Sequence, residues 1–121
     1  MTIKEGDKIP DATLMSMTDS GPKPMSTKDL FDGKKVALFS VPGAFTPTCS
    51  AQHLPGFVDN ADAIKAKGID TIACMAVNDA FVMSAWGNDR GVGDKILMLG
   101  DGNAELTKAM GLELDASGFG L

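Results

Sequence analysis

Three short apolar segments, each followed by a stretch with helical spacing, constrain the fold of this chain more than any other feature. The apolar segments are residues 35–41, 69–77 and 96–99. Their length and their content of Val, Ile, Leu and Phe predict buried strands, the first of them covered on both faces.

The segments between and after these strands place apolar side chains about 3.6 residues apart. The first ends at Gly68 and carries Leu54, Phe57, Val58, Ala61 and Ile64. The second follows Asp79, a typical helix cap, and the third spans residues 103–110. Regular alternation of strand and helix predicts an α/β fold with parallel central strands and right-handed crossovers.

The first part of the chain is rich in loops. Residues 12–17 alternate apolar and polar side chains, as a strand does, and a turn follows at residues 19–22. Residues 26–31 fit a short capped helix that ends at Gly33.

Length and composition indicate one globular domain over residues 1–121, with 44% hydrophobic and 22% charged residues. The net charge of −5 disfavours nucleic acid and anionic lipid as partners. No apolar run reaches the roughly 18–20 residues of a membrane helix, and the N-terminus does not resemble a signal peptide. Two cysteines are too few for a disulfide scaffold. Together with the lack of an export signal, they favour free thiols and a cytoplasmic location.

The turn after the first apolar strand carries the chemistry. Thr46 and Pro47 suit the cap and first position of a helix, which places Cys49 in its first turn. A helix start stabilises negative charge by about 0.3–1 kcal/mol, so a thiolate is favoured there, although high reactivity needs a further donor or cation. His53, four residues on, either supports that thiolate or has a structural hydrogen-bonding role.

Two blocks of residues resemble a known family. Pro42, Thr46 and Cys49 have the Pro-x-x-x-Thr-x-x-Cys spacing of peroxiredoxins. The run 41–57, and the run 74–83 followed by Trp86, are similar to the peroxiredoxin 5 subfamily, which includes bacterial and plant type II members. The resemblance extends from about Gly6 to Leu121.

The resemblance implies a thioredoxin-like fold, with a mainly parallel central sheet flanked by helices, and reduction of H2O2 and organic hydroperoxides without a cofactor. Cys49 looks like the peroxidatic cysteine, whose thiolate becomes a sulfenic acid. Thr46 would hydrogen-bond the peroxide together with backbone N–H groups, and Pro42 would shield the sulfur from water. Thioredoxin, glutaredoxin or glutathione would supply electrons, and a homodimer is expected.

One departure from the family lies at the end of the sequence. The family's active-site arginine follows the Gly-rich segment at 117–121, and Arg90 does not occupy its position. We therefore expect a C-terminally truncated fragment that lacks the final elements of the family. The sequence leaves open whether a glutaredoxin domain is fused in the parent gene. The alternative is a catalytically weak thioredoxin-fold redox sensor or interaction scaffold.

Other chemistry-bearing residues have competing interpretations. Cys74, in the second apolar strand, is either a resolving cysteine, which would require local unfolding of the Cys49 turn, or a packed core thiol. Trp86, Phe81 and Phe57 are expected in the core, with some lining a dimer face. The spacing of Cys49, His53 and Cys74 matches no zinc module, so no metal is expected. A Cys/His hydrolase is disfavoured because no third group orients His53.

Overall fold

The protein, described over residues 2–121 by a computed structural model, is built on a mixed sheet of five strands in the order β2-β1-β5-β4-β3. The strands are β1 Thr13–Thr18, β2 Gly21–Ser26, β3 Val36–Ser40, β4 Thr71–Ala76 and β5 Leu97–Gly100. Strands β3, β4 and β5 are parallel, whereas β1 pairs antiparallel with both β5 and β2. The three apolar segments therefore form strands that are parallel to one another, as predicted, within a sheet that is mixed as a whole.

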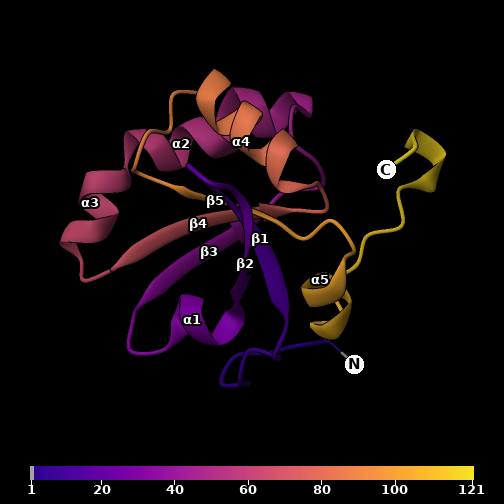
Figure 1. Cartoon of the computed structure of the whole chain (residues 1–121), viewed down its shortest axis with the longest axis horizontal. Helices are drawn as coiled ribbons and strands as arrows, with labels where there is room; N and C mark the ends of the chain where they lie inside the picture. Colours follow the sequence, from indigo (N-terminus) through magenta and orange to yellow (C-terminus); the bar gives the residue numbers. More distant parts are fainter. Residues whose placement is uncertain (1) are drawn as a thin grey trace.

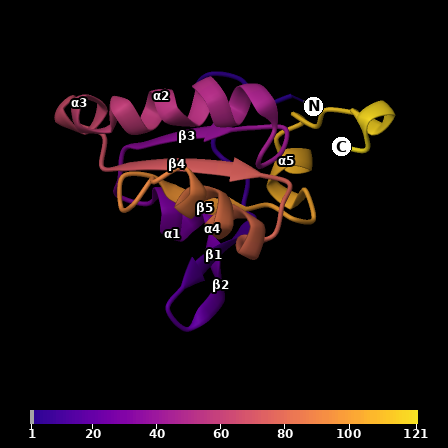
Figure 2. The same ribbon diagram turned by 90° about the horizontal axis from the view of Figure 1, so that it is seen from above.

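Helices cover both faces of this sheet (Figures 1 and 2). One face carries α2 Leu54–Asp59, α3 Ala61–Ala66 and α4 Ala80–Asp89, and the other carries α1 Thr27–Phe31 and α5 Glu105–Ala109. The predicted α/β architecture is therefore confirmed as three layers.

Strand β4 joins the two cores because its side chains alternate between the faces. Ile72, Cys74 and Ala76 pack in the layer of α2, α3 and α4, whereas Ala73 and Met75 pack in the layer of α1 and α5. Cys49 belongs to the first layer, so the sheet places both cysteines on the same face.

Side-chain caps start two of the helices where the sequence predicts them. Ser26 accepts a hydrogen bond from the backbone N–H of Asp29 at 3.1 Å, which begins α1. Asp79 accepts one from the N–H of Val82 at 2.8 Å, which begins α4. Each cap satisfies a donor that the first turn of a helix leaves free.

Strand positions differ from the prediction at the two sheet edges. Strand β2 was not predicted, since Pro22 and Pro24 weaken a strand pattern, but proline is tolerated in an edge strand. Strand β3 is half-buried rather than covered on both faces, because within residues 2–121 it pairs with β4 alone.

The single helix predicted up to Gly68 is in fact interrupted. It breaks at Asn60, whose backbone and side chain both donate to the carbonyl of Gly56, at 3.2 and 2.7 Å. The chain then continues as α3. Competition of this kind by an asparagine side chain for backbone groups ends helices.

Candidate active site

The candidate site lies where β3 ends and the chain turns into a helix. Val41 continues the sheet by donating its N–H to the carbonyl of Met75 at 3.1 Å. Phe45 then adopts a left-handed backbone with φ of 64°, a conformation that a bulky residue adopts at a cost. The N–H of Ala44 is held at 2.9 Å by the side-chain Oδ1 of Asn78, which follows β4.

The helix begins where the sequence predicts. Pro47 is its first helical residue, and the carbonyl of Thr46 accepts the first helical bond from the N–H of Ser50 at 2.9 Å. The hydroxyl of Thr46 does not cap the helix, however. It donates back to the carbonyl of Gly43 at 2.7 Å, so it braces the loop instead.

A wide helical turn, the π-helix Cys49–His53, holds the candidate cysteine. The N–H of Leu54 reaches the carbonyl of Cys49, five residues back. Pro55 explains this geometry, because it has no N–H to donate and its ring would collide with the carbonyl four residues earlier in a regular helix.

Cys49 is buried, with 8% of the residue exposed, and packs in the core. Within residues 2–121, its backbone N–H makes no hydrogen bond to a residue preceding the turn. A free N–H and a thiol therefore share one residue at a helix start, where electron-rich groups are stabilised.

Cys74 is fully buried in β4, in the same packed layer as Cys49, and both cysteines are free thiols. Burial and then the nearby Cys49 sulfur raise the pKa of the Cys74 thiol from 9.0 to about 12. The Cys74 sulfur therefore stays protonated at neutral pH and is a poor nucleophile in the folded state.

His53 packs among aromatic rings. Its ring centroid lies 5.0 Å from that of Phe39 and 5.7 Å from that of Phe57, and these two phenyl rings stack at 3.9 Å. No hydrogen bond joins His53 to Cys49 among the described residues. Among the described residues the His53 side chain makes no hydrogen bond at all, so neither predicted role, support of the thiolate or structural hydrogen bonding, is shown.

Ser50, directly after Cys49, has a partner that the sequence does not reveal. The indole Nε1–H of Trp86 donates to its hydroxyl at 3.0 Å, with both side chains buried. The pair lies 36 residues apart, beyond the reach of any local pattern. It ties the Cys49 turn to α4.

Of the remaining aromatic and cationic candidates, two pack in or against the core and two lie at the surface. Trp86 is in the core as predicted, and Phe57 packs against that core. The core assignment of Phe81 is wrong, since its side chain is 63% exposed. Arg90 follows α4 and pairs with Asp89 at 3.2 Å near the surface, which gives no reason to place it at the cysteine.

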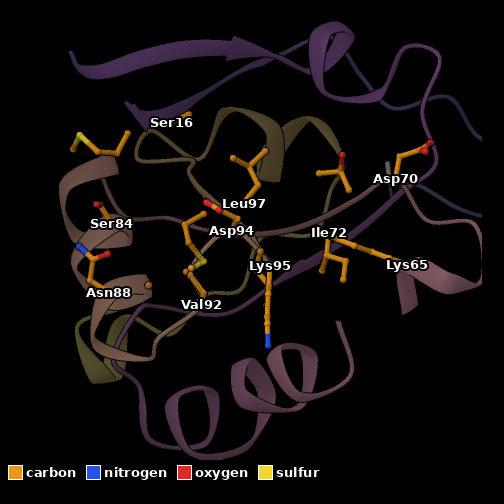
Figure 3. Close-up of a pocket in the computed structure, with 16 residues that line it drawn as sticks. Ser16, Lys65, Asp70, Ile72, Ser84, Asn88, Val92, Asp94, Lys95 and Leu97 are labelled. Carbon is orange, nitrogen blue, oxygen red and sulfur yellow. The ribbon is translucent and has the colours of Figure 1, made fainter. Parts of the chain in front are cut away.

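Two cavities lie at different distances from the Cys49 loop. One of about 470 Å³ adjoins the loop and is lined by residues that include Pro42, Val77, Leu112 and Leu121. The other, of about 420 Å³, lies at the amino ends of β4 and β5 and presents Lys65, Asp70, Asp94 and Lys95 (Figure 3). The second contains none of the residues 41–53, so it is separate from the cysteine site.

Within residues 2–121 no cluster of three or more His, Cys, Asp or Glu side chains is arranged to hold a metal ion. In the same residues, no helix is long and apolar enough to cross a membrane.

Comparisons with known proteins agree over nearly the whole chain. A family model described as Redoxin matches residues 4–120. Chloroplastic peroxiredoxin-2E-2 of Oryza sativa subsp. japonica is 55% identical over 119 residues, which are 96% of this chain and 53% of that protein. Peroxiredoxin-2B of Arabidopsis thaliana is 46% identical over 120 residues, covering 98% of this chain and 74% of that protein. The chain thus spans about half the length of the first relative.

Among solved structures, reduced Prx3 from Vibrio vulnificus in complex with H2O2 has a TM-score of 0.95 and 55% sequence identity. The match covers 98% of this chain and 75% of that one. This likeness confirms the thioredoxin-like fold that the sequence resemblance implies.

Proposed function

Because the chain belongs to the peroxiredoxin family, we propose that it is a thiol peroxidase that uses Cys49 to reduce H2O2 and organic hydroperoxides. The observation that carries this proposal is the likeness to Vibrio vulnificus Prx3, a protein solved in complex with H2O2. The local geometry supports it: the Cys49 thiol and a free backbone N–H belong to one residue at a helix start.

The reaction is a displacement at oxygen. The Cys49 thiolate attacks one peroxide oxygen, an S–O bond forms, and the O–O bond breaks. The leaving hydroxide or alkoxide takes a proton and departs as water or alcohol. The sulfur loses two electrons and becomes a sulfenic acid, and the peroxide gains them.

Thr46 and the Cys49 backbone would orient the peroxide. The Thr46 hydroxyl donates its hydrogen bond to the carbonyl of Gly43. Its oxygen lone pairs are therefore free to accept a hydrogen bond from the peroxide O–H. The free N–H of Cys49 would donate to a peroxide oxygen as charge develops there. Pro42, which is exposed on the loop and has no N–H, would limit access of water to the sulfur.

An external thiol would regenerate the enzyme. Cys74 is fully buried and its pKa is raised to about 12, so direct attack on the sulfenic acid would require the Cys49 turn to open. We therefore favour thioredoxin, glutaredoxin or glutathione: one thiol condenses with the sulfenic acid and releases water, and a second thiol reduces the resulting disulfide.

A homodimer and a cytoplasmic location complete the proposal. Val77 and Phe81 are 42% and 63% exposed and line one cavity, which a second copy of the chain could cover. Sedimentation of the parent protein and of Phe81→Ser tests the dimer. Fractionation of the source cells tests the location, and the rice relative is named as chloroplastic.

Replacement of Cys49 tests the activity directly. Cys49→Ser should abolish peroxide consumption in stopped flow, and the parent protein should gain one oxygen on Cys49 after one equivalent of H2O2. Cys74→Ser is the matched control, because it removes the other thiol and should leave the first step intact. Peroxide consumption by Cys49→Ser at the parent rate would refute the proposal. Oxidation of Cys49 without turnover by any thiol would favour the redox-sensor alternative.

A further inference from the structure

We propose that Asn78 is a positioning residue of the peroxidase site: its side-chain carbonyl holds the N–H of Ala44 and thereby fixes the loop that presents Thr46 and Cys49 to the peroxide. This inference rests on the proposed function and deepens it. The carrying observation is the partly buried 2.9 Å hydrogen bond between Ala44 N and Asn78 Oδ1, which joins residues 34 positions apart.

The loop needs such a bond because its own conformation is strained. Phe45 is left-handed and 49% exposed, so burial does little to hold it. A backbone of this kind costs on the order of 1–3 kcal/mol and persists when neighbouring contacts impose it. Within residues 2–121, no other hydrogen bond ties residues 42–46 to a distant element.

The backbone of Asn78 packs closely against its neighbours. A Cβ atom on Gly100 would lie 2.6 Å from the backbone carbonyl oxygen of Asn78, so β5 packs directly against the Asn78 backbone. On its other side, Asp79 caps α4. Because its backbone is packed in this way, the Asn78 side chain can hold the loop through the hydrogen bond that its Oδ1 accepts from Ala44.

The position of Ala44 in the loop links its hydrogen bond to the groups that orient the peroxide. Ala44 lies between Gly43, which accepts the Thr46 hydroxyl, and Phe45, which leads into the helix. Release of Ala44 would let the strained loop relax, and the Thr46 oxygen and Cys49 N–H would lose their mutual alignment. Displacements of about 1 Å in groups that orient a substrate cost up to roughly a hundredfold in rate.

Three variants of the full chain test the assignment. Asn78→Ala removes the acceptor, Asn78→Asp keeps an oxygen in the same place, and Asn88→Ala is the matched control. Asn88 is exposed near the end of α4, and its side chain makes no hydrogen bond within residues 2–121. Three quantities are measured at one pH: the rate of Cys49 with H2O2, its alkylation rate with iodoacetamide, and hydrogen exchange of the Ala44 amide.

Asn78→Ala should lower the peroxide rate by about tenfold to a hundredfold, while alkylation, which needs no peroxide alignment, stays at the parent rate. The Ala44 amide should lose its protection. Asn78→Asp should restore both the peroxide rate and the protection, and Asn88→Ala should match the parent protein. An unchanged peroxide rate in Asn78→Ala, or an equal fall in both rates, overturns the assignment.

The amide measurement separates this inference from the proposed function. A parent protein that consumes no peroxide refutes the function and, with it, the role in peroxide alignment. If the parent is active but its Ala44 amide exchanges as fast in the parent as in Asn78→Ala, the function stands and the Asn78 inference fails.

Discussion

The indole N–H of Trp86 donates a 3.0 Å hydrogen bond to the hydroxyl of Ser50, and both side chains are buried beside Cys49. Through this bond the middle of α4 holds the second residue of the wide turn. A buried hydrogen bond of this kind contributes about 0.5–1.5 kcal/mol to folding stability. A buried donor that is left without an acceptor costs about 1–3 kcal/mol.

We expect Ser50→Ala to lower the free energy of unfolding by about 1–3 kcal/mol, because the indole N–H then has no acceptor. Urea denaturation followed by circular dichroism measures the loss. Trp86→Phe and the double variant complete a cycle, whose coupling should be about 0.5–1.5 kcal/mol. Strictly additive losses would mean that the bond contributes nothing.

Cys74 should make stability fall at alkaline pH. Its pKa is raised in the folded state from 9.0 to about 12, mainly by burial. Below about pH 9 the thiol is protonated in both states, so its stabilising contribution is complete. Above that pH the unfolded chain loses the proton and the folded chain keeps it, so the free energy of unfolding falls by about 1.4 kcal/mol per pH unit, up to about pH 12.

The test compares Cys49→Ser with Cys49→Ser/Cys74→Ala from about pH 8.5 to 10.5. The stability difference between them should shrink with rising pH, because only the first carries the buried thiol. A difference that stays constant over this range would show that Cys74 ionises equally in both states.

Two glycines should respond in opposite directions to alanine. At Gly100 a new Cβ would lie 2.6 Å from the backbone oxygen of Asn78, so Gly100→Ala should destabilise the fold by about 1–3 kcal/mol. At Gly56, in α2, a new Cβ meets nothing within 4 Å, so Gly56→Ala should stabilise it by about 0.5–1 kcal/mol. Thermal unfolding of both variants measures the pair, and a stable Gly100→Ala protein would contradict the close approach.

His53 should be replaceable by another ring. Since it packs beside the stacked rings of Phe39 and Phe57, His53→Phe should keep both stability and the peroxide rate. The informative measurement is the pH–rate profile of His53→Phe beside that of the parent protein. A change in the shape of that profile would show that the imidazole acts on Cys49 after all.

Local signals predicted much of the fold. Apolar runs located β3, β4 and β5, and the caps Ser26 and Asp79 located the starts of α1 and α4. These features depend on residues a few positions apart, which a sequence displays directly. The Pro22 and Pro24 strand was missed because its strand conformation comes from pairing with β1 rather than from its own propensity.

Phe81 shows the limit of spacing arguments. The apolar side chains at residues 81, 82, 85 and 86 predict that Phe81 is buried with Trp86, yet α4 buries Met83, Trp86 and Gly87 and leaves Phe81 exposed. Which stripe of a helix meets the sheet depends on how α4 docks against β5 and β1, and that docking is a tertiary event.

By itself the sequence determined the strand–helix alternation and the placement of Cys49 in the first turn of a helix, because periodicity and capping act between near neighbours. Only the tertiary structure decided that Cys74 is a protonated buried thiol, that Trp86 holds Ser50, and that Asn78 holds Ala44. Each of these depends on which strands and helices become neighbours in space, and burial and long-range hydrogen bonds exist only after the layers have packed.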